Sequence, residues 1–260
     1  MKPHTSTSQR KLNTLALAAF AALATGAAPA FAAHDLPAGE TGSPVASPFP
    51  PSFSLGTLLT SSLISNVGAP GGAYTGSFAS AVYSNVATAA DAAASTGFTA
   101  GMAVLDFVYQ FTNTSPLTGT SIGRLSFFSF AKLGEDANGF RVLAWDTDAD
   151  IDGVGGIFVA GTQAADNAQR GFNGSTISMN YGYTATTDKI DQGESSFAVL
   201  LRVNASNYAP GYFSSINGTS VTVQSFQPVA AIPEPQTYAL MLAGLGAVGF
   251  MAKRRRRNDY

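Results

Sequence analysis

The chain has 260 residues, of which 45% are hydrophobic and only 12% are charged. It contains no cysteine, which excludes disulfides, thiolate zinc sites and catalytic thiols. Most of the cations lie at the two ends, so residues 34–232 carry six Lys and Arg against 14 Asp and Glu, a net charge near −8. A domain this acidic lacks the basic surface that nucleic acid requires, which excludes a nucleic-acid partner.

Residues 1–32 have the layout of a secretory signal peptide. Lys2, Arg10 and Lys11 precede an apolar stretch at 15–24, and Ala30 and Ala32 flank Phe31 in an A-x-A pattern. The ten-residue apolar run is too short to remain as a membrane anchor across a core of ~30 Å. We therefore predict a signal helix, export by a Sec-type machinery, and cleavage by signal peptidase after Ala32, with Ala33 as the alternative.

Residues 33–52 are rich in Pro, Gly and Ser, which predicts a flexible linker. His34, the one histidine that remains after signal cleavage, is expected to be exposed in this linker. The segment matches no strand or helix pattern, so we place the start of the folded domain at residue 53.

Residues 53–230 contain short runs in which apolar and polar side chains alternate, the signature of β-strands. The clearest runs are 105–111 and 197–203, and weaker ones cover 54–61, 76–83, 121–131, 140–145, 176–183 and 219–226. Asn-Gly pairs at 138–139, 173–174 and 217–218 predict turns, and 86–94 predicts a helical turn or two. About eight strands of this kind predict an all-β domain, an antiparallel, jelly-roll-like β-sandwich.

An acidic stretch in this domain is the one candidate metal site. Asp148, Asp150 and Asp152, with Gly153 behind them and Asp146 before them, match the first half of a calcium-binding loop. The twelfth position of that loop falls on Val159, where a bidentate glutamate belongs. An acidic solvated loop is the alternative. We expect no cofactor, with Ca²⁺ at these aspartates as the exception to test.

The domain offers little for catalysis. One histidine and no cysteine cannot assemble a Ser-His-Asp or Cys-His constellation, so we expect no enzyme. A glycosidase pair drawn from Glu135, Asp136 and Glu194 stays a remote alternative. A group of aromatic residues forms a candidate sugar-stacking surface, with packing in the core or at a strand edge as the alternative: Tyr181, Tyr183, Tyr208, Tyr212 and Phe213.

The last 28 residues hold three features in order. Pro233-Glu234-Pro235 predicts an extended segment that a protease can reach. The charge-free run 237–252 predicts a transmembrane helix that rises ~24 Å and is lengthened by Tyr238 and the arginines at its ends. The cluster Lys253, Arg254, Arg255, Arg256 and Arg257 holds the C-terminal end in the cytoplasm. The predicted topology, N-terminus out and C-terminus in, agrees with the signal peptide.

Over residues 231–257 this tail resembles the PEP-CTERM sorting signal, a tail that is also classified as an ice-binding protein C-terminal domain. The stretches 105–113 and 193–208 are also similar to ones that recur in domains before such tails. The resemblance implies that an exosortase, a membrane-embedded transpeptidase, cuts near Pro233, Glu234 and Pro235 and releases the domain to the surface of a bacterium that makes exopolysaccharide. An uncut single-pass anchor is the alternative.

These features together predict an exported protein with a transient inner-membrane anchor, destined for the cell surface or extracellular matrix. We expect a structural or adhesive role in association with exopolysaccharide and biofilm. The alternative is a carbohydrate-binding module, with or without Ca²⁺, and the remote alternative is a glycoside hydrolase.

Overall fold

The structure is a computed structural model, and it describes residues 34–43, 54–130, 140–153, 155–182, 189–230 and 240–248. The predicted signal peptide with Ala30 and Ala32 lies outside these ranges. So do the motif residues 233–235 and the basic cluster 253–257. The predictions for those segments therefore stay predictions.

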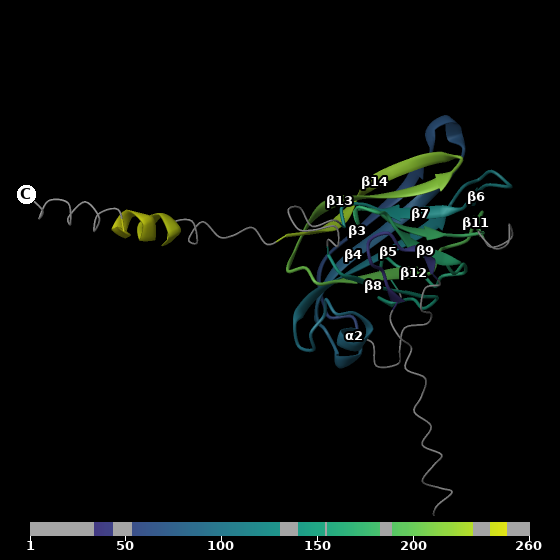
Figure 1. Ribbon diagram of the computed structural model, residues 1–260. Helices are drawn as coiled ribbons and strands as arrows, with labels where there is room; N and C mark the ends of the chain where they lie inside the picture. Colours follow the sequence, from purple (N-terminus) through teal and green to yellow (C-terminus); the bar gives the residue numbers. More distant parts are fainter. Residues whose placement is uncertain are drawn as a thin grey trace, which may run out of the picture. The chain divides into compact units, whose positions relative to one another are not determined.

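Two antiparallel sheets, each of six strands, form the domain (Figure 1). The first sheet has the order β1 (His34–Asp35), β8 (Val142–Thr147), β12 (Ala198–Val203), β5 (Ala103–Asn113), β4 (Thr75–Val86) and β3 (Thr57–Gly68). The second has the order β14 (Thr219–Val229), β13 (Asn207–Asn217), β7 (Arg124–Phe127), β10 (Ile177–Asn180), β9 (Asn167–Arg170) and β2 (Thr41–Ser43). A small third sheet pairs β6 (Ser121–Ile122) with β11 (Ile190–Asp191).

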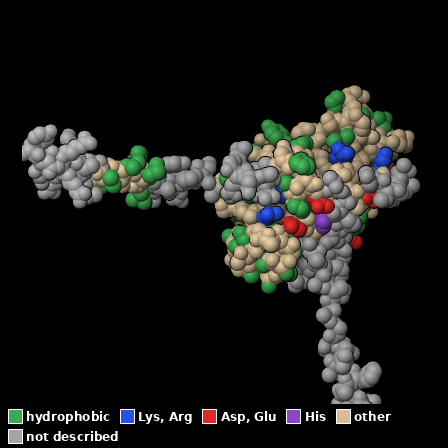
Figure 2. Space-filling model, viewed as in Figure 1, with side chains coloured by type: hydrophobic (Ala, Val, Ile, Leu, Met, Phe, Trp, Pro, Cys, Tyr) green, Lys and Arg blue, Asp and Glu red, His purple; other side chains and the backbone are tan. Residues whose placement is uncertain are grey.

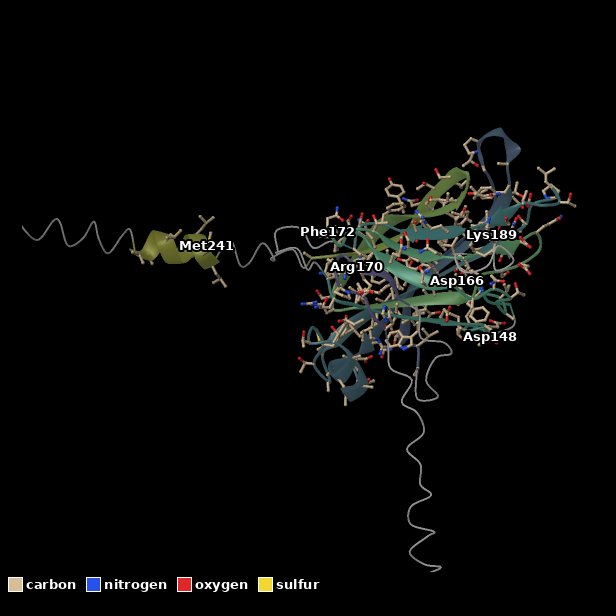
Figure 3. The ribbon with its side chains drawn as sticks, turned by 45° about the vertical axis from the view of Figure 1, so that its right-hand side comes forward. Asp148, Asp166, Arg170, Phe172, Lys189 and Met241 are labelled. Carbon is tan, nitrogen blue, oxygen red and sulfur yellow. The ribbon has the colours of Figure 1, made fainter. Side chains whose placement is uncertain are left out.

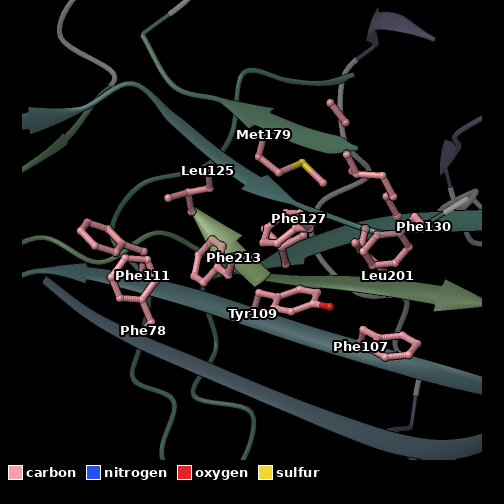
Figure 4. Close-up of a cluster of buried hydrophobic side chains, with 14 of the residues drawn as sticks. Phe78, Phe107, Tyr109, Phe111, Leu125, Phe127, Phe130, Met179, Leu201 and Phe213 are labelled. Carbon is pink, nitrogen blue, oxygen red and sulfur yellow. The ribbon is translucent and has the colours of Figure 1, made fainter. Parts of the chain in front are cut away.

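The main core lies between the two large sheets, so the all-β, antiparallel prediction is confirmed (Figure 4). Tyr109 of β5 stacks on Phe127 of β7 with ring centroids 4.4 Å apart, and Phe78 of β4 meets Phe213 of β13 edge-on at 4.8 Å. Aromatic pairs in these arrangements contribute about 0.5–1.5 kcal/mol beyond the area they bury. The contacts join strands of opposite sheets, so they hold the two layers face to face.

A second cluster covers the outer face of the first sheet. Val108, Leu143 and Trp145 are buried there beneath Phe98 and Phe158. The short helix α2 (Ala89–Ala94) and the turn η1 (Pro70–Gly72) complete the described elements of the domain. Because β5 is buried on both faces, Asp106, Val108 and Gln110 are not solvent-facing as simple alternation implies.

Each of the eight predicted runs overlaps a strand, but the strand count and order differ from the prediction. The described residues hold fourteen strands rather than about eight. Consecutive strands β3, β4 and β5 are neighbours in one sheet, a meander and not the jelly-roll order that we expected. The predicted helical stretch 86–94 contains α2, and turns follow at 173–174 and 217–218 as expected.

β13 does not show as an alternating run because Pro210 and Gly211 interrupt its pattern. β13 pairs with β14 along its whole length but with β7 only from Phe213 onward. Pro210 therefore lies where the strand has a single described neighbour, and there a missing N–H removes no second ladder bond.

The linker prediction for 33–52 is wrong for residues 34–43. His34–Asp35 pairs with β8, and Thr41–Ser43 pairs with β9. Leu36 is fully buried, and its carbonyl accepts a 2.7 Å hydrogen bond from Arg170 Nη1. The composition of a segment does not reveal that one of its apolar residues, here Leu36, is buried in the domain. His34 is consequently half-buried rather than exposed, and burial lowers its pKa against the opposing charges of Glu40 and Asp35.

A separate helix covers residues 240–248, inside the predicted membrane span 237–252 (Figure 1). Within the ranges that the structure describes, no helix has the length and apolar character needed to cross a bilayer. Both ends of the predicted span lie outside those ranges.

Candidate functional site

The described part of the C-terminal tail is strongly apolar and exposed. Helix 240–248 carries five large apolar side chains that are more than half exposed: Leu240, Met241, Leu242, Leu245 and Val248. Met241 is labelled on this helix in Figure 3. Each exposed leucine forgoes about 1.5–3 kcal/mol of burial.

The predicted calcium residues do not converge on one point. Asp146 is buried within β8, where its Oδ2 accepts a hydrogen bond from Ala165 N–H. Asp150 accepts from Gly153 N–H at 3.0 Å, and Asp152 accepts from Ile157 N–H at 2.7 Å. Asp148, labelled in Figure 3, is exposed. In the part of the chain that is described, no three Asp, Glu or His side chains gather closely enough to hold a metal.

The hydrogen bonds of Asp150 and Asp152 close a loop. Asp152 also accepts from Phe158 N–H at 3.2 Å, and Phe158 is buried in the outer cluster. The calcium hypothesis stays a prediction without support from the geometry.

A buried ion network is the strongest electrostatic feature of the domain. Arg202 of β12 donates through Nε and Nη2 to the two carboxylate oxygens of Asp106 on β5, each at 2.7 Å. Its Nη1 donates to Asp91 of α2 at 2.9 Å, and its guanidinium carbon lies 5.6 Å from the Trp145 ring centroid. Burial acts to lower the pKa of Arg202, but hydrogen bonds and charges from Asp106 and Asp91 outweigh it, so the pKa is raised.

This network attaches α2 to the first sheet. Asp91 also forms a capping box with Thr88, so the same carboxylate begins the helix and binds the arginine. Because Arg202, Asp106 and Asp91 are all bound in ion pairs, the network is suited to stabilising the fold rather than to transferring protons. Asp106 and Arg202 belong to the two clearest alternating runs of the sequence, but only the register of β12 against β5 shows that they lie opposite each other.

The candidate sugar-stacking aromatics divide between core and surface. Tyr181 and Phe213 are buried, while Tyr208 and Tyr212 are 36% and 58% exposed on β13; Tyr183 lies outside the described ranges. Sequence reasoning missed Phe172, which is 92% exposed between β9 and β10. The available signal was an aromatic residue inside a turn sequence, Gly171 to Gly174.

The described residues do not show a pair of carboxylates that supports the glycosidase alternative. Glu194 Oε2 accepts a hydrogen bond from Asp191 N–H at 2.9 Å within a turn. Glu135 and Asp136 lie outside the described residues. Charged side chains are sparse on the face seen in Figure 2, in keeping with the composition.

The fold and the tail together define a β-sandwich followed by a short apolar helix near the C-terminus. Residues 231–257 match the family model of the PEP-CTERM protein-sorting motif. The match confirms the predicted resemblance at the same residues. It indicates an exported protein that an exosortase processes and that is sorted to the cell envelope or surface. No curated protein and no solved structure matches the chain.

Proposed function

We propose that this chain is a structural or adhesive protein of the bacterial surface or extracellular matrix, associated with exopolysaccharide and without enzymatic activity. The observation that carries the proposal is the sorting motif at 231–257, which directs the preceding β domain to the envelope or surface. Helix 240–248, with its exposed leucines, supports the location of the tail in an apolar environment.

In this proposal the tail acts as a transient anchor. Residues 237–252 span the inner membrane as a helix, and Lys253 to Arg257 hold its end in the cytoplasm. The exosortase cuts near Pro233-Glu234-Pro235, after signal peptidase has removed residues 1–32 at the other end. What remains is the sandwich of residues 34–230, whose first strand, β1, begins close behind the signal cleavage site.

The non-enzymatic part of the proposal rests on how the ionisable groups are used. Arg202 forms ion pairs with both Asp106 and Asp91 inside the domain, and Asp150 and Asp152 close a loop. These groups build the fold, which leaves the sandwich surface to provide binding or matrix contacts.

The test compares the host with and without its exosortase. Cells are fractionated, and mass spectrometry reads the C-terminus of the chain in each fraction. We expect a chain that ends near residue 233 in the surface fraction of the parent, and a chain with its full tail in the inner membrane of the mutant. Identical fractions and an intact tail in both strains would contradict the proposal. The N-terminal peptide from the same samples is expected to begin at Ala33.

A further inference from the structure

One side chain of the domain is unusually exposed for its type. Phe172 lies at the tip of the turn between β9 and β10 and is 92% exposed. Leaving a phenylalanine in water forgoes about 2–3 kcal/mol of burial. Single exposed apolar residues are common, but this one is held in place by an ordered turn and borders a hollow.

Hydrogen bonds order the turn that carries Phe172. Gly171 N–H donates to Thr176 O and Gly174 N–H donates to Gly171 O, both at 2.8 Å. Asn173 Oδ1 accepts from the backbone and hydroxyl of Ser175. Gly174 has φ +69°, a conformation that side chains other than glycine's rarely adopt.

Beside Phe172 lies a hollow of about 250 Å³, which we name the Phe172 hollow. Its lining combines the aromatic ring with a carboxylate, an amide and two hydroxyls, from Glu40, Gln169, Thr176 and Ser178. The Ser178 hydroxyl is itself held by a 3.0 Å hydrogen bond with the buried hydroxyl of Ser126 on the next strand.

Arg170 holds the floor of the Phe172 hollow in place. Its buried guanidinium donates to the carbonyls of Leu36, Phe130 and Gly174 at 2.7–3.0 Å, so three separate segments are joined behind the hollow. Arg170 and Phe172 lie at the same end of the domain (Figure 3). A binding surface that is rigid before the ligand arrives loses less conformational entropy on binding.

The chemistry of the lining selects the ligand. A sugar ring offers a flat face of C–H groups for an aromatic side chain and a rim of hydroxyls for amide, carboxylate and hydroxyl partners. An apolar ligand would require a deeper and more apolar pocket. The Arg170 guanidinium at the floor is already bonded to three backbone carbonyls, while the Glu40 carboxylate and the net acidity of residues 34–232 repel acidic polymers. We infer that the Phe172 hollow binds a neutral polysaccharide chain, with Phe172 as the stacking platform and Gln169 among the hydrogen-bonding groups.

The test uses the full chain, purified in a detergent without sugar, and measures its sedimentation with insoluble neutral polysaccharides: microcrystalline cellulose, curdlan and chitin. We expect saturable binding to at least one of them and weaker binding to alginate beads. Phe172→Ala is expected to weaken binding roughly ten-fold or more, because the ring provides most of the apolar contact. Gln169→Ala is expected to weaken it by a smaller factor.

Tyr212→Ala is the matched control, since Tyr212 is an exposed aromatic on β13 of the same sheet and lies outside the hollow. Thermal unfolding of each variant checks that the fold is retained. The inference is overturned if no neutral polysaccharide binds, if alginate binds best, if Phe172→Ala binds like the parent, or if Tyr212→Ala alone removes binding. The assay is independent of sorting, so its failure leaves the proposed delivery to the surface untouched.

Discussion

The Tyr74 hydroxyl donates a 2.7 Å hydrogen bond to the backbone carbonyl of Ser215, 141 residues further along the chain. Tyr74 precedes β4 of the first sheet and Ser215 belongs to β13 of the second, so this one bond joins the two layers. The Ser215 hydroxyl also lies 2.8 Å from the same phenolic oxygen. Tyr109 of β5 makes a comparable bond to the carbonyl of Phe226 on β14, again at 2.7 Å.

Tyr74→Phe removes the inter-sheet bond and keeps the ring in the core. We expect the free energy of unfolding to fall by about 1 kcal/mol, the usual net value of one hydrogen bond. For a domain of this size, that corresponds to a midpoint about 2–4 °C lower. Thermal unfolding of the full chain in detergent, followed by far-UV circular dichroism, measures it. Tyr208→Phe, at a partly exposed tyrosine, is the control; an equal shift in both variants would contradict the assignment.

Arg202→Met leaves Asp106 and Asp91 buried without their cation. We expect a loss of about 3–5 kcal/mol in the free energy of unfolding, because the two carboxylates then repel each other in a poorly solvated site. Denaturant unfolding gives the value. Arg124→Met is the matched control at an exposed arginine and is expected to change stability by about 0.5 kcal/mol or less. A similar small effect at Arg202 would show that the network contributes little.

The domain is expected to lose stability above pH 10. Burial raises the pKa of Tyr74, Tyr83, Tyr109 and Tyr181 above the usual value of 10.0. Above pH 10 the unfolded chain therefore releases protons that the folded chain keeps, so stability is full below pH 10 and falls as the pH rises. Arg170 acts in the opposite sense, because burial lowers its pKa to about 10. We expect the loss of stability from the four tyrosines to exceed the gain from the one arginine.

Absorbance at 295 nm and the thermal midpoint, measured together from pH 9 to 12, check this prediction. Tyrosines that ionise only as the domain unfolds are expected to appear as a cooperative step. A gradual titration of all nine tyrosines near pH 10, with an unchanged thermal midpoint, would contradict the burial of these four tyrosines.

Glu234→Gln in the sorting motif is expected to leave the full tail on the chain and to retain the chain in the inner membrane, because we propose that the exosortase cuts near Pro233-Glu234-Pro235. Glu194→Gln, at a glutamate of the β domain, is the control and is expected to sort normally. Cell fractionation, with mass spectrometry of the C-terminus, measures the location and the cleavage of both variants. Normal cleavage of Glu234→Gln would show that processing does not require this glutamate.

Replacing Lys253 to Arg257 with glutamine tests the membrane stop. Without cations the C-terminal end loses its preference for the cytoplasm. We expect a protease-accessible C-terminal tag outside the cell in the variant and a protected one in the parent. A protected tag in both would show that the basic cluster does not set the topology.

The strands and the tail could be predicted from the sequence because their signals are local. Alternation in 105–111 follows from the two-residue period of a strand, and the order of prolines, apolar run and arginines in 231–257 needs no folding to be recognised. Other features depend on contacts between residues far apart in the chain. Asp106 pairs with Arg202, and the Leu36 carbonyl accepts a hydrogen bond from Arg170. The hollow beside Phe172 likewise includes the distant Glu40. Only the tertiary structure decides such contacts, because strand register and sheet packing bring those side chains together, and neither is encoded in any single stretch of residues.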